Sequence, residues 1–310
     1  MPALYLLVTI FFWGTAFRAS AVGAEHTSPI MLTALRAAPA ALVLLAAALV
    51  LHRGFPARRL WLPTVITGLL MVTLTFEGIS EGTARAGAGN AAVLLNASPF
   101  FVLVLARIFL RERAPWPAIL GLVLGFAGIV VMVSGQLGGI EDTGDFALGM
   151  AIALAGALGW AVGVLMTKQL FTRYADLDVL GFTVAQYLVG GAAALVLAFA
   201  IDGTGGTGWG SASLWEAVAW IAVGSSAIAT LAFFGALKRM SATTVTAWQF
   251  LTPAVAVIVE MVYGNTPDAI VLAGMGLAIV GVALVNAAPL LSDRLLFQER
   301  RIRWSYSKVP

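Results

Sequence analysis

Residues 60–99 read LWLPTVITGLLMVTLTFEGISEGTARAGAGNAAVLLNASP, and residues 214–253 read LWEAVAWIAVGSSAIATLAFFGALKRMSATTVTAWQFLTP. The two stretches align without a gap and bring together three matched pairs, which are Trp61 with Trp215, Arg85 with Arg239, and Pro99 with Pro253. Apolar helices rich in Ala, Leu, Val and Gly resemble one another by composition alone. Tryptophan, arginine and proline are rarer, and their agreement at a single offset indicates an internal repeat.

The composition predicts a membrane protein. Apolar residues make up 60% of the 310 residues and charged residues 11%, whereas a soluble domain carries roughly 25% charged residues. A chain this poor in charge cannot cover its surface against water, so its expected solvent is lipid. The absence of cysteine excludes disulfides and thiolate metal sites, and both histidines lie in expected loops. We therefore expect no metal site and no cofactor, and the small net charge of +3 gives no reason to expect nucleic acid as a partner.

A membrane-spanning helix needs about 20 mostly apolar residues. The first apolar run has the interruptions Trp13 and Arg18 and no preceding Lys or Arg, so we treat it as a span and not as a cleaved signal. Runs of sufficient length predict an all-α protein of ten transmembrane helices, at about 3–22, 30–51, 60–80, 87–109, 116–134, 147–170, 179–201, 214–235, 242–263 and 269–288. Lys and Arg concentrate in alternate loops and in the tail, which predicts that both termini are cytoplasmic.

Ten spans and the repeat together define the expected domain organisation. The first five-helix repeat covers 1–135, a linker loop covers 136–146, the second repeat covers 147–290, and a basic cytoplasmic tail covers 291–310. Because each copy holds an odd number of spans, the two copies must cross the membrane in opposite orientations. Inverted repeats of this kind serve alternating access around a site near the bilayer midplane.

Three segments of the first copy resemble a known family. They are Asn90-Ala-Ala-Val-Leu-Leu-Asn-Ala-Ser-Pro99, Leu110-Arg-Glu-Arg113, and the glycine-rich helix from Gly121 to Gly128. The chain resembles the EamA-type carriers of the drug/metabolite transporter superfamily over about 3–288, and the branch that exports amino acids, including aromatic ones, is the most similar. The second copy departs from the pattern at Asn265, near the position of Glu112, which favours a structural role for that glutamate.

The resemblance implies a central cavity surrounded by spans one, three, four, six, eight and nine. The expected substrate-binding residues on these spans are aromatic or carry an amide: Trp13, Trp160, Asn90, Asn96, Trp248 and Gln249. Trp13 and Trp160 are repeat mates set deeper than the interface where tryptophan usually lies. These residues either line the cavity and bind a zwitterion, or they pack and hydrogen-bond between helices.

Charged residues and prolines inside the spans are the expected gate and hinge residues. Pro99 and Pro253 occupy matching positions and are either hinges or tolerated kinks. Arg18 with Glu77 is a candidate outer gate, and Glu260 lies toward the same side. Arg36 is a candidate for binding a substrate carboxylate or for pairing with Glu77. The alternative for these charged residues is that they snorkel to the interface.

These features predict a secondary transporter that exports small metabolites, with amino acids as the expected substrates, across the bacterial inner membrane by alternating access. No nucleotide-binding Gly-x-x-x-x-Gly-Lys-Ser/Thr motif is present, so a gradient must supply the energy. The sequence contains no His-Glu-x-x-His motif, so it gives no sign of a zinc metalloprotease. Carriers of nucleotide sugars or drugs in the same superfamily are the nearest alternatives, and a passive channel or a membrane-embedded enzyme are more distant ones.

Overall fold

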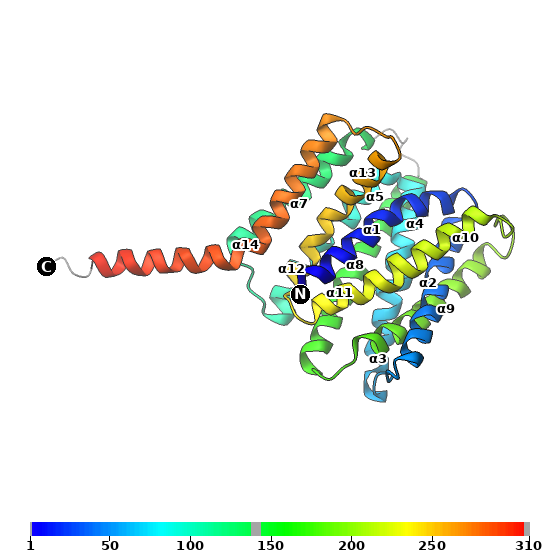
Figure 1. Ribbon diagram of the computed structural model, residues 1–310, viewed down its shortest axis with the longest axis horizontal. Helices are drawn as coiled ribbons and strands as arrows, with labels where there is room; N and C mark the ends of the chain where they lie inside the picture. The colour runs from blue at the N-terminus through cyan, green and yellow to red at the C-terminus, as the bar shows by residue number, and fades with distance from the viewer. Residues whose placement is uncertain (1, 138–143, 307–310) are drawn as a thin grey trace.

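A computed structural model describes residues 2–137 and 144–306, and Figure 1 shows it as a bundle of helices. Ten of its helical segments are long and apolar enough to cross a membrane, and the described residues contain no strand. The spans are Pro2–Ala24, Pro29–Val50, Arg58–Ala86, Ala88–Leu110, Trp116–Val133, Gly144–Arg173, Val179–Ile201, Ala212–Leu237, Ala242–Val262 and Ala269–Pro289. The predicted fold class and all ten spans are confirmed.

Six of the spans are single α-helices. They are α1 (Pro2–Ala24), α2 (Pro29–Val50), α7 (Trp116–Val133), α8 (Gly144–Arg173), α9 (Val179–Ile201) and α14 (Ala269–Tyr306). A short 3-10 turn, η4 (Ser134–Gln136), follows α7. The last helix runs past the predicted end of its span into the basic tail and leaves the bundle at an angle (Figure 1). The proline inside it, Pro289, lies where the span ends and the tail begins.

The other four spans are interrupted, and the interruptions follow the repeat. Span three contains η1 (Arg58–Leu60), α3 (Trp61–Gly68), η2 (Leu69–Leu74) and α4 (Thr75–Ala86), and span eight contains α10 (Ala212–Ala219), η5 (Trp220–Ile228) and α11 (Ala229–Leu237). Span four contains α5 (Ala88–Leu95), α6 (Ser98–Leu105) and η3 (Ala106–Leu110), and span nine contains α12 (Ala242–Ala247), η6 (Trp248–Leu251) and α13 (Thr252–Val262). The wider π-helical turns η2 and η5 occupy matching places in the two copies.

The two prolines explain the breaks in spans four and nine. Pro99 lies in the first turn of α6 and Pro253 in the first turn of α13. Proline has no N–H to continue the preceding helix and its ring clashes with the preceding turn, whereas the first turn of a new helix tolerates it. The predicted kinks are therefore present at both positions, and whether the helices bend there during transport stays a prediction.

Helix packing follows the repeat. The first helix of the first copy, α1, packs on α11 and α13 of the second copy, and the first helix of the second copy, α8, packs on α4 and α6 of the first. The remaining spans pair with their own repeat mates, α2 with α9 and α7 with α14. Each helix thus has in the second copy the neighbours that its mate has in the first, which is the packing expected of an inverted repeat.

The packing of α7 on α14 depends on glycine. A Cβ atom on Gly128 would lie 2.6 Å from the Gly274 carbonyl oxygen, and one on Gly281 would lie 2.3 Å from the Gly125 amide nitrogen. At these positions backbone meets backbone, so that no side chain fits and no flexible neighbour can move aside. Small residues on both helices thus allow their backbones to approach closely.

We expect Gly281→Ala to destabilise the protein by about 1–3 kcal/mol, the usual penalty for forcing a methyl group into a filled site. Gly276 on the same helix has open space where its Cβ would lie, so Gly276→Ala is the matched control and should leave stability unchanged or slightly raised. Thermal unfolding of the purified protein in detergent measures both. Equal melting temperatures for the two variants would contradict the close packing of α7 on α14.

The loops divide the bundle into two ends of different charge. The basic end holds the N-terminus and the loops 51–57, 111–115, 174–178 and 238–241, and its side chains bond across spans, as in the Arg53–Asp178 ion pair at 3.5 Å. The acidic end holds the loops 25–28, 202–211 and 263–268. The names basic end and acidic end are used below.

Candidate functional site

Three aromatic rings, one each from α1, α8 and α11, lie in contact with one another. The ring centroids of Trp13 and Trp160 are 5.5 Å apart, and Phe233 lies 5.3 Å from the first and 5.1 Å from the second. Trp160 is 8% exposed. The predicted tryptophan pair is thus brought together from the two repeats.

A buried arginine is linked to this cluster through span eight. The Arg36 guanidinium donates to the hydroxyls of Ser225 at 3.1 Å and Ser226 at 3.4 Å, and it lies 4.0 Å from the centre of the Phe76 ring. The indole N–H of Trp13 donates to the carbonyl of the same Ser225 at 3.1 Å. Arg36 is 6% exposed, and the described residues give it no carboxylate partner. Its charge is therefore available to an anion that reaches this point.

The breaks in spans four and nine meet at a polar contact. The Ser98 hydroxyl of α6 donates to Gln249 Oε1 at 3.2 Å, a bond that joins the two copies. Gln249 Nε2, Trp160 Nε1 and the Thr252 hydroxyl are buried and have no hydrogen-bond partner among the described residues. Unpartnered buried donors are uncommon and call for an explanation such as a ligand or an ordered water.

Three of the predicted binding residues donate side-chain hydrogen bonds to other groups of the protein. The side-chain amides of Asn90 and Asn96 each donate at 2.8 Å to a carbonyl one turn earlier on their own helix, that of Ala86 and Ala92. The Trp248 indole donates to Asn286 on the peripheral helix α14 at 3.2 Å. As substrate donors these three side chains are therefore weaker candidates than Trp160 and Gln249.

Arg18 and Glu77 are not paired in this structure, so their role as an outer gate stays a prediction. Arg18 instead forms an ion pair with Glu260 at 3.2 Å and lies over the ring of Tyr263 at 3.7 Å. The reason is packing, because α1 lies along α13 and not along α4. The alternative pairing of Arg36 with Glu77 is also not formed, since both Glu77 oxygens have no hydrogen-bond partner among the described residues.

The basic end is closed by contacts that cross between two groups of helices. The first group contains α1, α11, α12 and α13, and the second contains α4, α5, α6 and α8. At this end α12 packs on α6 and α8, and Lys168 of α8 donates to the carbonyls of Leu237 at 3.0 Å and Met240 at 2.7 Å. The amide of Ala242, which begins α12, donates to the Glu112 carboxylate in the loop after span four.

The acidic end has contacts of a different kind. Its ion pairs among the described residues stay within one group: Arg18 with Glu260 in the first, and Arg85 with Glu81 and Asp145 in the second. The closely packed helix pairs at this end are likewise α1 with α13 and α4 with α8. The two groups are therefore joined at the basic end and are not tied together by charge at the acidic end.

The sequence profile of the EamA-like transporter family matches residues 1–134 and 147–287, which are the two five-span halves. The chain belongs to this family. As an EamA-like transporter it is a multi-pass membrane protein, and its named relatives are transporters and not enzymes.

Several curated EamA-like relatives match over nearly their whole length. A Streptantibioticus cattleyicolor protein named "probable terminal-alkyne amino-acid exporter" is 28% identical over 91% of this chain and 92% of its own. The inner membrane transporter YedA of Escherichia coli is 26% identical over 92% of this chain and 89% of its own, and the transporter YvbV of Bacillus subtilis is 24% identical over 92% and 91%. A solved structure described only as that of a protein superposes with a TM-score of 0.79 at 21% identity, covering 95% of this chain and 98% of its own. That likeness supports the fold.

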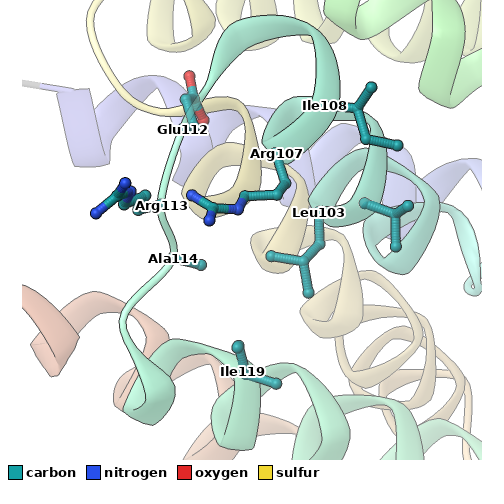
Figure 2. A pocket seen from close by; sticks show the side chains of 8 residues that line it. Leu103, Arg107, Ile108, Glu112, Arg113, Ala114 and Ile119 are labelled. Carbon is teal, nitrogen blue, oxygen red and sulfur yellow. The ribbon is translucent and has the colours of Figure 1, made fainter.

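Two surface hollows in this EamA-like transporter lie away from the predicted site. Figure 2 shows the larger, of about 480 Å³, between α6, η3 and the start of α7, with Arg107 and Arg113 beside it. The smaller lies at the basic end between Tyr5, Arg53 and Arg239. Both are open at the surface at the ends of helices, so neither is the central cavity that the resemblance implies.

Glu112 provides a pH test of the basic-end closure. Burial raises the pKa of Glu112, and the nearby Lys168 ammonium and the Ala242 amide oppose that rise. A carboxyl whose pKa is raised on folding contributes stability below its ordinary pKa and loses that contribution as pH rises through the raised value. We expect the melting temperature of the wild type, relative to Glu112→Gln, to fall as pH rises from about 4. A pH-independent difference between the two proteins would contradict this expectation.

Several residues of the site were not expected from the sequence. Phe233 aligns in the repeat with Ile79, which is aliphatic, so the repeat did not predict that Phe233 joins the aromatic cluster. Ser225 and Ser226 were a usable signal, because two adjacent hydroxyls in an apolar span need partners. Lys168 caps the end of α11 by donating to carbonyls there. This role depends on tertiary packing, and the local sequence does not predict it.

Proposed function

We propose that this EamA-like transporter exports amino acids or closely similar zwitterions across the bacterial inner membrane by alternating access. The substrate would lie where the breaks of spans four and nine approach the rings of Trp13 and Trp160. The observation that carries the proposal is the set of buried, unpartnered donors at this level, Trp160 Nε1 and Gln249 Nε2, joined by the Thr252 hydroxyl.

The chemistry of the unpartnered groups favours a carboxylate. Indole and amide N–H groups are donors, and a carboxylate accepts several hydrogen bonds at once. Arg36 adds a buried positive charge linked through Ser225 to Trp13. A carboxylate near these donors would satisfy groups that otherwise remain desolvated without a partner, which costs about 1–3 kcal/mol each.

The aromatic rings favour a substrate with an apolar side chain. Trp13, Trp160 and Phe233 offer ring faces and edges with one free indole N–H. A small or aromatic neutral amino acid fits such a mixture of apolar wall and polar donor better than a nucleotide sugar, whose phosphates would need several cations. The relative named as an amino-acid exporter supports the same substrate class.

The orientation that we propose places the basic end in the cytoplasm. Lys and Arg are retained on the cytoplasmic side of membrane proteins, and the loops of that end carry Arg53, Arg111, Arg113, Lys238 and Arg239. Relatives that are named inner membrane transporters support the location. In this arrangement the structure is closed toward the cytoplasm, and export requires the contacts of Lys168 and Glu112 to separate.

Uptake into proteoliposomes tests the proposal. Purified protein would be reconstituted and offered labelled amino acids, nucleotide sugars and cationic drugs in parallel, with protein-free liposomes as the control. We expect saturable uptake of one or more amino acids, accelerated by unlabelled amino acid on the opposite side. Uptake confined to another class would overturn the substrate assignment, and flux indifferent to substrate on the opposite side would indicate a channel.

A further inference from the structure

We propose that Glu77 is the proton-binding residue through which a proton gradient drives transport, a step that rests on the proposed export function. Glu77 lies on α4 and is 7% exposed, and neither carboxylate oxygen has a hydrogen-bond partner among the described residues. An ionised carboxylate in such a place would be desolvated without compensation, whereas the protonated acid is uncharged. In this conformation the carboxyl group therefore holds a proton.

No cation among the described residues forms an ion pair with Glu77. On the same helix Arg85 is paired with Glu81 and with Asp145 at the start of α8. On α2 the Arg36 guanidinium is bound by Ser225 and Ser226.

The other ionisable groups near Glu77 are acidic. Glu81 and Asp202, at the end of α9, lie near enough to interact with it, and each already has a partner of its own, Arg85 for Glu81 and Ser28 for Asp202. The neighbouring segments α5 and η2 contain no charged residue. A bound proton is thus the remaining means of removing the charge.

The position of Glu77 connects it to the substrate site. A Cβ on the next residue, Gly78, would lie 2.8 Å from the Gly156 Cα atom of α8. The Thr75 hydroxyl donates to the Leu70 carbonyl at 2.8 Å and to the Gly156 carbonyl at 3.2 Å. Gly156 precedes Trp160 by four residues, which places both on one face of α8.

This backbone contact gives the coupling a physical route. Loss of the proton from Glu77 creates a charge that must reach water, and the α4 segment that carries it cannot shift without moving α8 at Gly156. A shift of α8 moves Trp160 within the ring cluster. The cycle is balanced: the carboxylate takes up one proton from the side of higher proton activity and releases it to the other side, while substrate moves the opposite way.

The first arm of the test detects the proton directly and needs no substrate. Infrared absorption of the reconstituted protein at neutral pH should contain the carbonyl band of a protonated carboxylic acid. We expect Glu77→Gln to lose this band and Glu81→Gln, one turn along the same helix and paired with Arg85 in the wild type, to keep it. A wild type without the band, or a Glu77→Gln variant that retains it, would overturn the proposal.

The second arm measures coupling with a mixture of labelled neutral amino acids. With one proton exchanged per substrate, a pH gradient of one unit can sustain about tenfold accumulation. Glu77→Gln should equilibrate the amino acids without accumulating them, and should retain exchange of labelled for unlabelled substrate. Accumulation by Glu77→Gln equal to that of the wild type would refute the coupling role. If no protein transports amino acids, the substrate assignment fails while the infrared arm still decides whether Glu77 holds the proton.

Discussion

Trp160→Ala is expected to reduce the rate of amino-acid uptake by about 10- to 100-fold, equivalent to about 1.4–2.7 kcal/mol. The substitution removes the ring that contacts both Trp13 and Phe233 and also removes the unpartnered indole N–H. Buried tryptophans at the centre of a binding site commonly carry energies of this size. Initial rates in proteoliposomes, normalised to folded protein, measure the effect.

Two further variants separate binding from folding. Trp160→Phe keeps an aromatic ring beside Trp13 but has no N–H, so we expect it to restore stability while affinity for the substrate stays reduced. Trp215 is 43% exposed and its indole already donates to the Trp209 carbonyl, so Trp215→Ala should transport normally. Normal transport by a folded Trp160→Ala protein would remove Trp160 from the site.

Joining α6 to α12 by a disulfide is expected to reduce transport to the level of protein-free liposomes. Four residues from the Ser98–Gln249 contact along each helix lie Val102 and Val245, both fully buried in the same core cluster. The chain has no cysteine of its own, so Val102→Cys with Val245→Cys places a single pair across the closed basic end. Alternating access requires these helices to separate, and the bond would hold them together.

The controls for this experiment are internal. Each single cysteine variant should transport under oxidising conditions, and a reducing agent should restore the double variant. A gel shift after thiol labelling reports how much of the double variant is cross-linked. Full transport by protein shown to be cross-linked would mean that the basic end does not open in this way.

The fold could be predicted because its main signals are local and strong. The ten apolar runs, the repeat and the glycine pattern of 121–128 follow from composition and spacing, and the structure confirms the spans. The glycines of α7 lie against α14, a pairing that their spacing alone did not specify. The end of span three was placed too early, at about residue 80, because Glu77 and Glu81 resembled a loop. The helix continues to Ala86 because tertiary packing buries both carboxylates.

The candidate site was harder to predict, because partner choice depends on which helices touch. Trp13 and Trp160 were found through repeat symmetry, which the structure brings into contact. Arg18 pairs with Glu260 and not with Glu77 in this structure, a choice that the sequence alone could not show because nothing local distinguishes the two glutamates until α1 is seen to lie on α13. The asparagines were expected to face a ligand, although an asparagine amide in a helix can also donate to its own preceding turn, as Asn90 and Asn96 do.

The ends of the bundle differ chemically although the helices repeat, since the position of Glu112 at one end has Asn265, and no glutamate, near it at the other. When the two ends of a carrier differ chemically, its two conformations differ in free energy and are not equally populated. With the basic end closed by Glu112 and Lys168, the substrate-free carrier would rest in the conformation that is open at the acidic end. The return of the substrate-free carrier to the opposite conformation would then limit the rate of turnover. Amino acid added outside, at the acidic end, should accelerate this return, so that external amino acid increases the rate at which internal amino acid leaves.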